Sequence, residues 1–184
     1  ALPSLTVFEG TLGAVASIPG VTRSRGYEND GGVPDADGIP GHSICMVVEG
    51  GDTAAIAEAI AAKKGPGAGT YGTTEALVRD KFGVPNVIKF FRPVETPVYA
   101  TIRPFPGYLS TTGESIRKNV AEHINGLNIG DDVSLSRLYS PANAANAASY
   151  DIESITLGTS QGAQSAANVA VAFNAVASCS VDRV

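Results

Sequence analysis

The sequence predicts an α+β protein of two small mixed domains, each built from short strands and helices. The 21 glycines and 11 prolines among 184 residues argue against long helices. Helix and strand patterns are mixed without the regular strand–helix–strand period of a doubly wound sheet. A boundary near Glu95 divides the chain into a domain over residues 1–94, of a central type that ends in a strand pair, and a C-terminal α+β domain over residues 95–184.

The first domain is expected to begin with a helix over residues 4–17, capped by Ser4. The alternating residues 21–29 favour an extended edge strand. Residues 30–41 are rich in Asp, Gly and Pro, which predicts a loop, and the apolar run over residues 42–49 predicts a buried strand. The residues expected on the apolar face of the first helix are Leu5, Phe8, Leu12 and Val15.

The clearest helix signal covers residues 53–64, where Asp52 caps the N-terminus and a Gly-Pro pair follows the C-terminus. Ile56 and Ile60 form its apolar stripe, and we expect them to pack against the buried strand over residues 42–49. A glycine-rich loop then leads to two short strands that close the first domain. These strands are predicted over residues 75–79 and 87–91.

In the second domain, residues 98–103 alternate and predict a strand. The main helix is expected to start at a capping box formed by Thr111 and Glu114 and to end near Gly126. Its apolar face holds Ile116, Val120, Ile124 and Leu127.

The last third of the chain gives weaker signals. A short helix or irregular segment is expected over residues 135–139, stopped by Pro141, and a strand over residues 152–157. Residues 169–173 alternate, and a final strand is expected to begin at Cys179. Cys45 and Cys179 both lie in apolar alternating contexts, so we expect buried free thiols rather than a disulfide.

Charge and composition exclude several classes of partner. The formal net charge is −5, and no run of Lys or Arg exceeds two residues, so a duplex-binding face is not expected. No apolar stretch approaches the roughly 20 residues that span a bilayer. Aromatic residues make up only 7%, without any Trp, which argues against a sugar-stacking or base-stacking platform. We therefore expect neither a nucleic acid nor a membrane as a partner.

Two glycine patterns match motifs without their context. Residues 67–72 read G-x-G-x-x-G, but the pattern follows a helix and precedes a strand, the reverse of a dinucleotide fingerprint. Residues 158–162 read G-x-S-x-G around Ser160, whereas a hydrolase of that type needs its acid and then its His after the Ser. Both histidines, His42 and His123, lie upstream. We expect no catalytic residue and no cofactor.

An acidic loop holds Asp30, Asp35 and Asp37. A calcium loop places oxygen ligands at alternate positions, and Ile39 breaks that phase. Turns built by Asp side chains are therefore favoured, and we expect no metal site.

Several segments carry a family resemblance through their order and spacing. They read DGIPGH (37–42), VVEGGDTAAIAEAI (47–60), KKGPGAGTYG (63–72), VIKFFRP (87–93), PVYATI (97–102), INGLNIG (124–130) and SRLYSP (136–141). Together they resemble the baseplate J-like family, which includes the Mu-type baseplate wedge proteins of contractile-tailed phages and prophages. The resemblance implies a wedge subunit that bridges the central tail hub to peripheral baseplate parts, without catalytic residues. It also implies that the chain is a fragment that lacks an N-terminal region.

The resulting expectation is a non-enzymatic structural protein of the virion tail baseplate, assembled in the bacterial host cytoplasm. Its partners are expected to be other baseplate and tail subunits, with no small-molecule substrate. The contact surface is predicted at aromatic and apolar residues that flank loops: Tyr108, Leu109, Leu138 and Tyr139. Two alternatives stay open: a serine hydrolase that uses Ser160, and a cation-dependent host-surface binding module that uses Asp30, Asp35 and Asp37.

Overall fold

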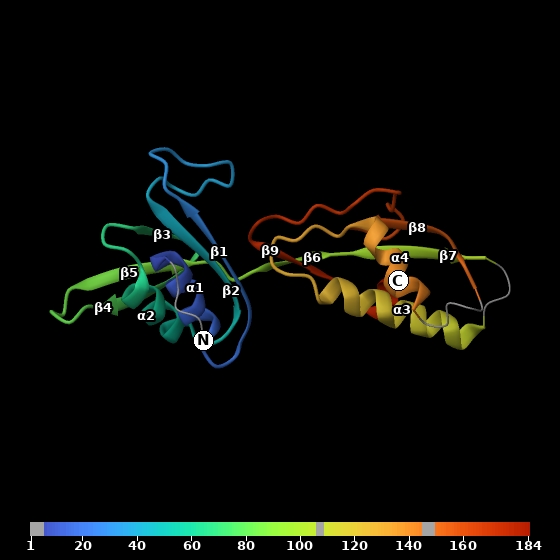
Figure 1. Ribbon diagram of the computed structural model, residues 1–184, viewed down its shortest axis with the longest axis horizontal. Helices are drawn as coiled ribbons and strands as arrows, with labels where there is room; N and C mark the ends of the chain where they lie inside the picture. The colour runs from blue at the N-terminus through green and yellow to red at the C-terminus, as the bar shows by residue number, and fades with distance from the viewer. Residues whose placement is uncertain (1–5, 106–108, 145–149) are drawn as a thin grey trace. The chain divides into compact units, whose positions relative to one another are not determined.

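The computed structural model describes residues 6–105, 109–144 and 150–184 and has the predicted α+β class, with helices and short strands in small mixed sheets (Figure 1). The chain divides into two compact units, Ala1–Pro93 and Val94–Val184. This division follows Pro93, close to the boundary expected near Glu95. We describe each unit by itself.

Over residues 6–93, the N-terminal unit combines a three-stranded sheet, two helices and a β-hairpin. In the sheet, β1 is antiparallel to β2 and lies at an edge, as expected, and β3 is parallel to β2. The hairpin consists of β4 and β5 in antiparallel register. The elements are α1 (Val7–Ala16), β1 (Val21–Asn29), β2 (Ser43–Gly50), α2 (Thr53–Lys63), β3 (Gly69–Tyr71), β4 (Thr74–Arg79) and β5 (Pro85–Phe90).

Local signals explain both helices of this unit. Asp52 caps α2 by accepting a hydrogen bond from the Ala55 N–H, at 2.9 Å, as predicted. The first helix starts later than expected, with Thr6 and Glu9 forming a capping box. Ser4, which was expected to cap it, lies outside the described residues. The short strand β3 is a correction, because a loop was predicted there.

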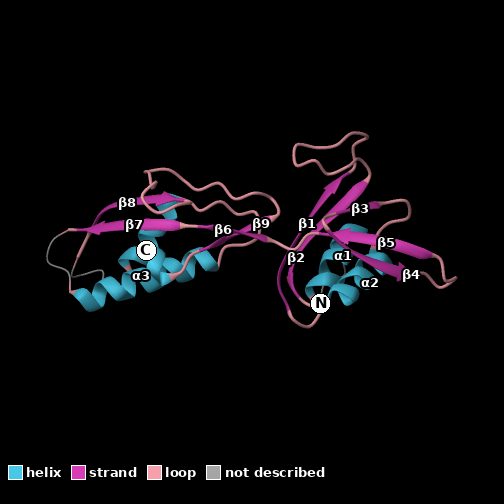
Figure 2. Ribbon diagram, turned by 180° about the vertical axis from the view of Figure 1, so that it is seen from behind, coloured by secondary structure: helices cyan, strands magenta, loops and turns pink. Residues whose placement is uncertain are grey.

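The core of the N-terminal unit lies between the helices and the strands. Figure 2 shows α1 and α2 together against the strands, while the tip of the β4–β5 hairpin extends beyond them. Ile56 and Ile60 are fully buried in one cluster with residues of β2, which confirms the expected packing. The other buried members of this cluster are Val15, Ile44, Met46, Val48, Ala57, Ile88 and Phe90.

In its described residues, the C-terminal unit holds two strand pairs and two α-helices. Strands β6 and β9 are parallel, and β7 and β8 are antiparallel. The elements are β6 (Val94–Pro97), β7 (Tyr99–Pro104), α3 (Ser110–Asn125), α4 (Leu135–Asn143), β8 (Ile152–Gly158), β9 (Ala175–Ser178) and a 3₁₀ turn, η1 (Val181–Arg183).

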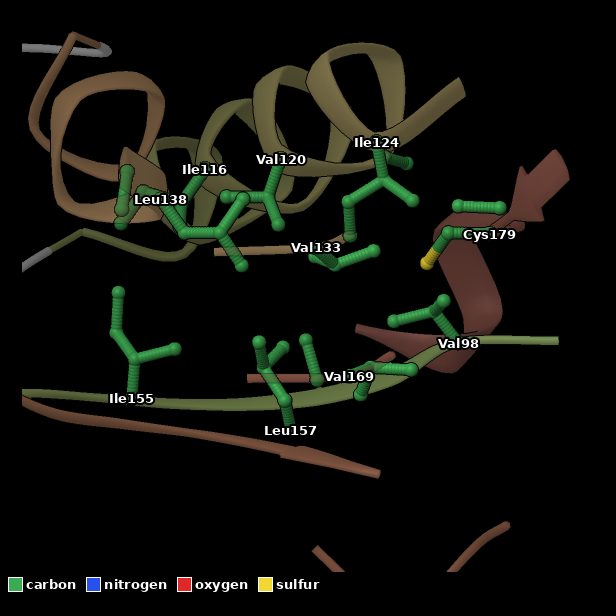
Figure 3. Close-up of a cluster of buried hydrophobic side chains, with 14 of the residues drawn as sticks. Val98, Ile116, Val120, Ile124, Val133, Leu138, Ile155, Leu157, Val169 and Cys179 are labelled. Atoms are coloured by element: carbon green, nitrogen blue, oxygen red, sulfur yellow. The ribbon is translucent and has the colours of Figure 1, made fainter. Parts of the chain in front are cut away.

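The core of this unit lies between α3 and the strands. Figure 3 shows Ile116, Val120 and Ile124 on the inner side of α3, facing Ile155 and Leu157 of β8. The predicted apolar face of the main helix is therefore confirmed, and Leu127 packs against the same cluster.

The expected start of that helix was wrong. The helix begins at Ser110, with Leu109 as an N-cap that makes no side-chain cap hydrogen bond, and Thr111 lies inside the first turn. Thr112 is buried one turn before Ile116 and lengthens the buried stripe. Packing of this stripe, rather than a capping box, therefore sets the helix start.

Tertiary contacts also overrode the signals near the C-terminus. Helix α4 continues past Pro141, because Leu138 and Ala142 are buried one turn apart and the Tyr150 hydroxyl donates to the Ala142 carbonyl. No strand begins at Cys179. Its N–H donates to Asn125 Oδ1 at 2.9 Å, and its carbonyl accepts from Asn125 Nδ2 at 2.7 Å, so the pairing of β9 ends there.

The alternating residues 169–173 were expected to be extended. Val169 makes an isolated antiparallel bridge to Val133, and the Val171 N–H donates to Asp132 Oδ1 at 2.8 Å. No named strand forms there among the described residues.

Candidate functional site

The predicted contact surface is only partly exposed. Leu109 is 69% exposed, whereas Leu138 is fully buried in the core of the C-terminal unit. Leu138 was therefore the wrong choice, because the inner face of α4 carries it. Tyr139 is half-buried and packs against the same core. Tyr108 lies outside the described residues.

A larger exposed apolar surface lies on the hairpin of the N-terminal unit. The side chains of Leu77, Phe82, Val84 and Val87 are 59%, 79%, 53% and 53% exposed. We call these four residues the hairpin surface. They make up four of the ten large hydrophobic residues that are exposed in the described part of the chain. Leu77 and Val87 lie on the strands, and Phe82 and Val84 lie at the turn. Exposed apolar groups on one hairpin are typical of surfaces that bind other proteins.

Strand alternation explains how the surface forms. Leu77 lies directly opposite Val87 in the antiparallel register, so both side chains point to the same face. Their neighbours Ile88 and Phe90 point to the other face and are buried in the core. The hairpin thus has one apolar face on its own unit, and on its solvent face the apolar pair Leu77 and Val87 lies among charged residues.

The turn of the hairpin holds its shape through one carboxylate. Asp80 Oδ1 accepts hydrogen bonds from the N–H groups of Phe82 and Val84, both at 2.9 Å, and Gly83 takes a φ of +80°. The ring of Phe82 is exposed, with the Lys81 ammonium 5.0 Å from its centroid, and it lines an open hollow with Val78 and with Ala61 and Ala62 of α2. A phenylalanine at a polar turn is unexpected if its ring is exposed to solvent alone, so we expect another molecule to contact this ring.

The base of the hairpin is fixed to the sheet. The Phe91 N–H donates to the Met46 carbonyl at 2.8 Å, and the Val48 N–H donates to the Phe91 carbonyl at 2.9 Å. The Arg92 guanidinium donates to the Gly51 carbonyl at 2.9 Å and to Thr53 Oγ1 at 3.0 Å, and it also bonds the carbonyls of Val48 and Gly50. The base of the hairpin is therefore joined to β2 and to the start of α2 by several hydrogen bonds.

The glycines at residues 67–72 have a packing role in the described structure. Gly69 lies in β3, and its N–H donates to the His42 carbonyl at 2.9 Å. A Cβ at Gly72 would collide with the backbone of Phe90. The motif therefore lets β3 and β5 approach closely. From the sequence, these residues were predicted only as a glycine-rich loop.

The hydrolase alternative needs a histidine near Ser160. Ser160 lies in an exposed turn after β8, where its carbonyl accepts from the Ala163 N–H at 3.3 Å. His123, in the same unit, lines an open cavity of about 370 Å³ with Asp131, Asp132 and Arg137. Within the described residues of this unit, no hydrogen bond joins Ser160 to His123.

The acidic loop is organised by its own side chains, as predicted. Asp35 Oδ1 accepts from the N–H groups of Asp37 at 3.0 Å and Ile39 at 2.9 Å. The Asn29 amide donates to the carbonyls of Val33 and Ile39, which ties the loop to the end of β1. Over the described ranges, no three His, Cys, Asp or Glu side chains are grouped so as to hold a metal ion.

Both cysteines are buried free thiols, as predicted. Burial raises the pKa of the Cys45 thiol to about 12, and the negative charges of Asp35 and Asp37 add to the effect. Burial also raises the pKa of Cys179, against a smaller lowering by the Arg183 cation. A nucleophilic cysteine needs a lowered pKa, so neither thiol has the electrostatics of a catalytic group.

Comparison with known proteins gives no relative: no family model matches the chain, and no curated protein gives a significant match. Within the part of the chain that the structure describes, no helix combines the length and apolar character needed to cross a membrane.

The hairpin surface was missed by the sequence analysis, although the sequence holds a signal for it. Both strands contain consecutive apolar residues, at Ala76–Val78 and at Val87–Ile88, so apolar side chains lie on both faces of the hairpin. Such strands are typical of sheets covered on both sides. Within the described residues of this unit, only the inner face of the hairpin is covered.

Proposed function

We propose that the chain is a structural subunit of a phage-type contractile tail baseplate, a wedge component that acts through protein–protein contacts. The observation that carries the proposal is the hairpin surface, four exposed apolar side chains on one hairpin of the N-terminal unit. The type of assembly, a contractile tail baseplate, is inferred from the family resemblance. The segments that carry this resemblance occur in both units, from residue 37 to residue 141.

The hairpin surface suits a contact that forms once and persists. Four large apolar side chains are held by strand pairing and by the Asp80 turn, so little conformational freedom is lost when a partner covers them. Charged residues make up only 17% of the sequence, below the usual quarter, which favours a protein whose surface is partly covered in its working state. Leu109, at the start of α3, is a second exposed apolar position.

The proposed partners are other baseplate and tail subunits, and the proposed location is the tail baseplate of the virion, assembled in the host cytoplasm. Stable contacts in such an assembly typically bury about 1,200 Å² or more in total. The hairpin surface supplies the apolar centre of such a contact, and its flanking charges, Glu75, Arg79 and Lys89, supply a polar rim.

Electron microscopy of intact contractile tails tests this proposal. Tails purified from the phage or prophage that encodes the chain are expected to contain it, with both units fitting density in the baseplate and the hairpin surface covered by a neighbour. An antibody against the chain is expected to label the baseplate end of the tail. Purified tails that lack the chain, or density that leaves the hairpin in solvent with no subunit against it, contradict the proposal.

A further inference from the structure

We propose that β4 pairs with β4 of a second copy of the chain, antiparallel, about a two-fold axis at Leu77. The two hairpins then form one four-stranded sheet in the order β5-β4-β4-β5. This inference rests on the proposed role of the hairpin as a protein contact surface, and it names the partner of that surface.

The outer edge of β4 is available for pairing. Its sheet has two strands, in the order β4-β5, and no bridge to a third strand reaches β4 among the described residues. Natural edge strands are often protected from pairing by a proline, a bulge or charged side chains, lysine above all. Residues 74–79 read TEALVR, without a proline, glycine or lysine, and their register with β5 is regular.

The hydrogen-bond alternation shows which backbone groups point to this edge. Lys89 lies opposite Glu75, and the Lys89 N–H donates away from β4, to Thr70 Oγ1 at 2.9 Å. Glu75 and Lys89 therefore form a non-hydrogen-bonded pair, in which both residues direct their backbone groups outward. The Asp80 N–H, five residues on, donates to the Val84 carbonyl at 3.0 Å, in agreement with this phase. Alternation then directs the N–H and C=O groups of Glu75, Leu77 and Arg79 to the open edge.

The charges of Glu75 and Arg79 favour one register of β4, with a second copy of the chain as the partner. With Leu77 opposite Leu77, Glu75 of each copy lies opposite Arg79 of the other, which makes two opposite-charge pairs. Because all three residues have outward backbone groups, these cross-strand positions are also hydrogen-bonded pairs. An axis at Ala76 places Leu77 opposite Glu75, and an axis at Val78 places Leu77 opposite Arg79. The strand is therefore self-complementary about Leu77.

The apolar side chains agree with the same register. Leu77 and Val87 share one face of the hairpin, so pairing brings the two Leu77 side chains together between the two Val87 side chains. These residues are 59% and 53% exposed in a single copy. Glu75 already lies 3.7 Å from the Lys89 ammonium, and in the pair it lies between Lys89 of its own copy and Arg79 of the second copy.

Charge exchange on the purified chain tests the inference. The wild-type chain is expected to form a dimer in analytical ultracentrifugation as its concentration is raised. Glu75→Arg alone and Arg79→Glu alone each place like charges opposite each other, and each is expected to be monomeric. An equimolar mixture of the two variants restores opposite charges at both positions, so a mixed dimer is expected, as is a dimer of the double variant Glu75→Arg with Arg79→Glu.

A matched control is Glu153→Arg, which makes the same charge change at an exposed position of β8 and is expected to leave the dimer intact. Circular dichroism checks that each variant is folded. A wild-type chain that stays monomeric, single variants that remain dimeric, or a mixture that stays monomeric overturns the inference. If the chain is monomeric but its hairpin variants are no longer incorporated into purified tails, the pairing with a second copy is wrong. The proposed function is then still supported.

Discussion

The β4–β5 hairpin of the N-terminal unit and the β7–β8 pair of the C-terminal unit have the same construction and different outer faces. Both are two-stranded and antiparallel, and both place apolar residues against helices on one side. On the other side, Leu77 lies opposite Val87 in the hairpin, whereas Thr101 lies opposite Thr156 in the second pair.

This difference distinguishes the apolar residues that folding requires from those that a contact with a partner requires. A strand pair that packs on one side requires one apolar face, and the usual residues on the free face are polar ones that favour strands, such as threonine. The β7–β8 pair follows this rule. The hairpin does not, so Leu77 and Val87 have no evident use within their own unit, and their burial by a partner is the physical reason we propose for them.

The largest expected effects come from the inner faces, where the two pairs are alike. Ile60→Ala in α2 and Ile155→Ala in β8 should each lower the free energy of unfolding by about 2–5 kcal/mol, because both side chains are buried and leave a cavity. Urea unfolding measures the loss, and hydrogen exchange assigns it to one unit. A change below about 0.5 kcal/mol for Ile60→Ala means that α2 is peripheral and that the hairpin lacks a firm inner face.

The anchor of the hairpin should give the next largest effect. Arg92→Lys is expected to lower the free energy of unfolding by about 1.5–3 kcal/mol, because an ammonium does not reproduce the fork of donors to the Gly51 carbonyl and Thr53 Oγ1. The matched control is Arg103→Lys on β7, whose exposed side chain should tolerate the change within about 0.5 kcal/mol. Equal effects of the two substitutions contradict the anchoring role.

The buried thiol of the N-terminal unit predicts a dependence on high pH. Because the fold raises the pKa of Cys45 from about 9 to about 12, the protonated thiol is favoured in the folded state. Its contribution to stability is fully present below about pH 9 and is lost as the pH rises toward about 12, since the unfolded thiol ionises first. In the Cys45→Ala variant, the part of the stability loss at high pH that comes from this thiol should disappear. Alkylation by iodoacetamide at pH 8 should be much slower in the native chain than in urea; equal rates contradict the burial.

Elements with complete local signals were predictable from the sequence. The helix α2 has its cap at Asp52, its stripe at Ile56 and Ile60 and its stop at the Gly65-Pro66 pair, so its bounds follow from local chemistry. The buried face of α3 follows from spacing in the same way. The start of α3 does not, because its N-cap, Leu109, makes no side-chain cap bond and packing decides the boundary.

The contact surface could not be predicted with the same success, for a physical reason. Sequence periodicity shows that a strand or helix has an apolar face, but it does not show which face its neighbours cover. Leu138 was expected at a surface, and the rotation of α4 against the core buries it. Leu77 and Val87 lie on a face that α2 does not reach, which only the three-dimensional arrangement reveals.

The smallest expected effects concern the two outer faces and compare them directly. Leu77→Thr and Val87→Thr give the hairpin the outer face of the β7–β8 pair. Each should change the free energy of unfolding by less than about 0.5 kcal/mol, because the side chains are more than half exposed and threonine favours strands. Thr156→Val in the second pair should change it by a similarly small amount. Measurements at low protein concentration keep association out of the comparison. If Leu77→Thr costs more than about 1 kcal/mol under these conditions, the residue stabilises its own unit, and the contrast between the two strand pairs no longer indicates a contact surface.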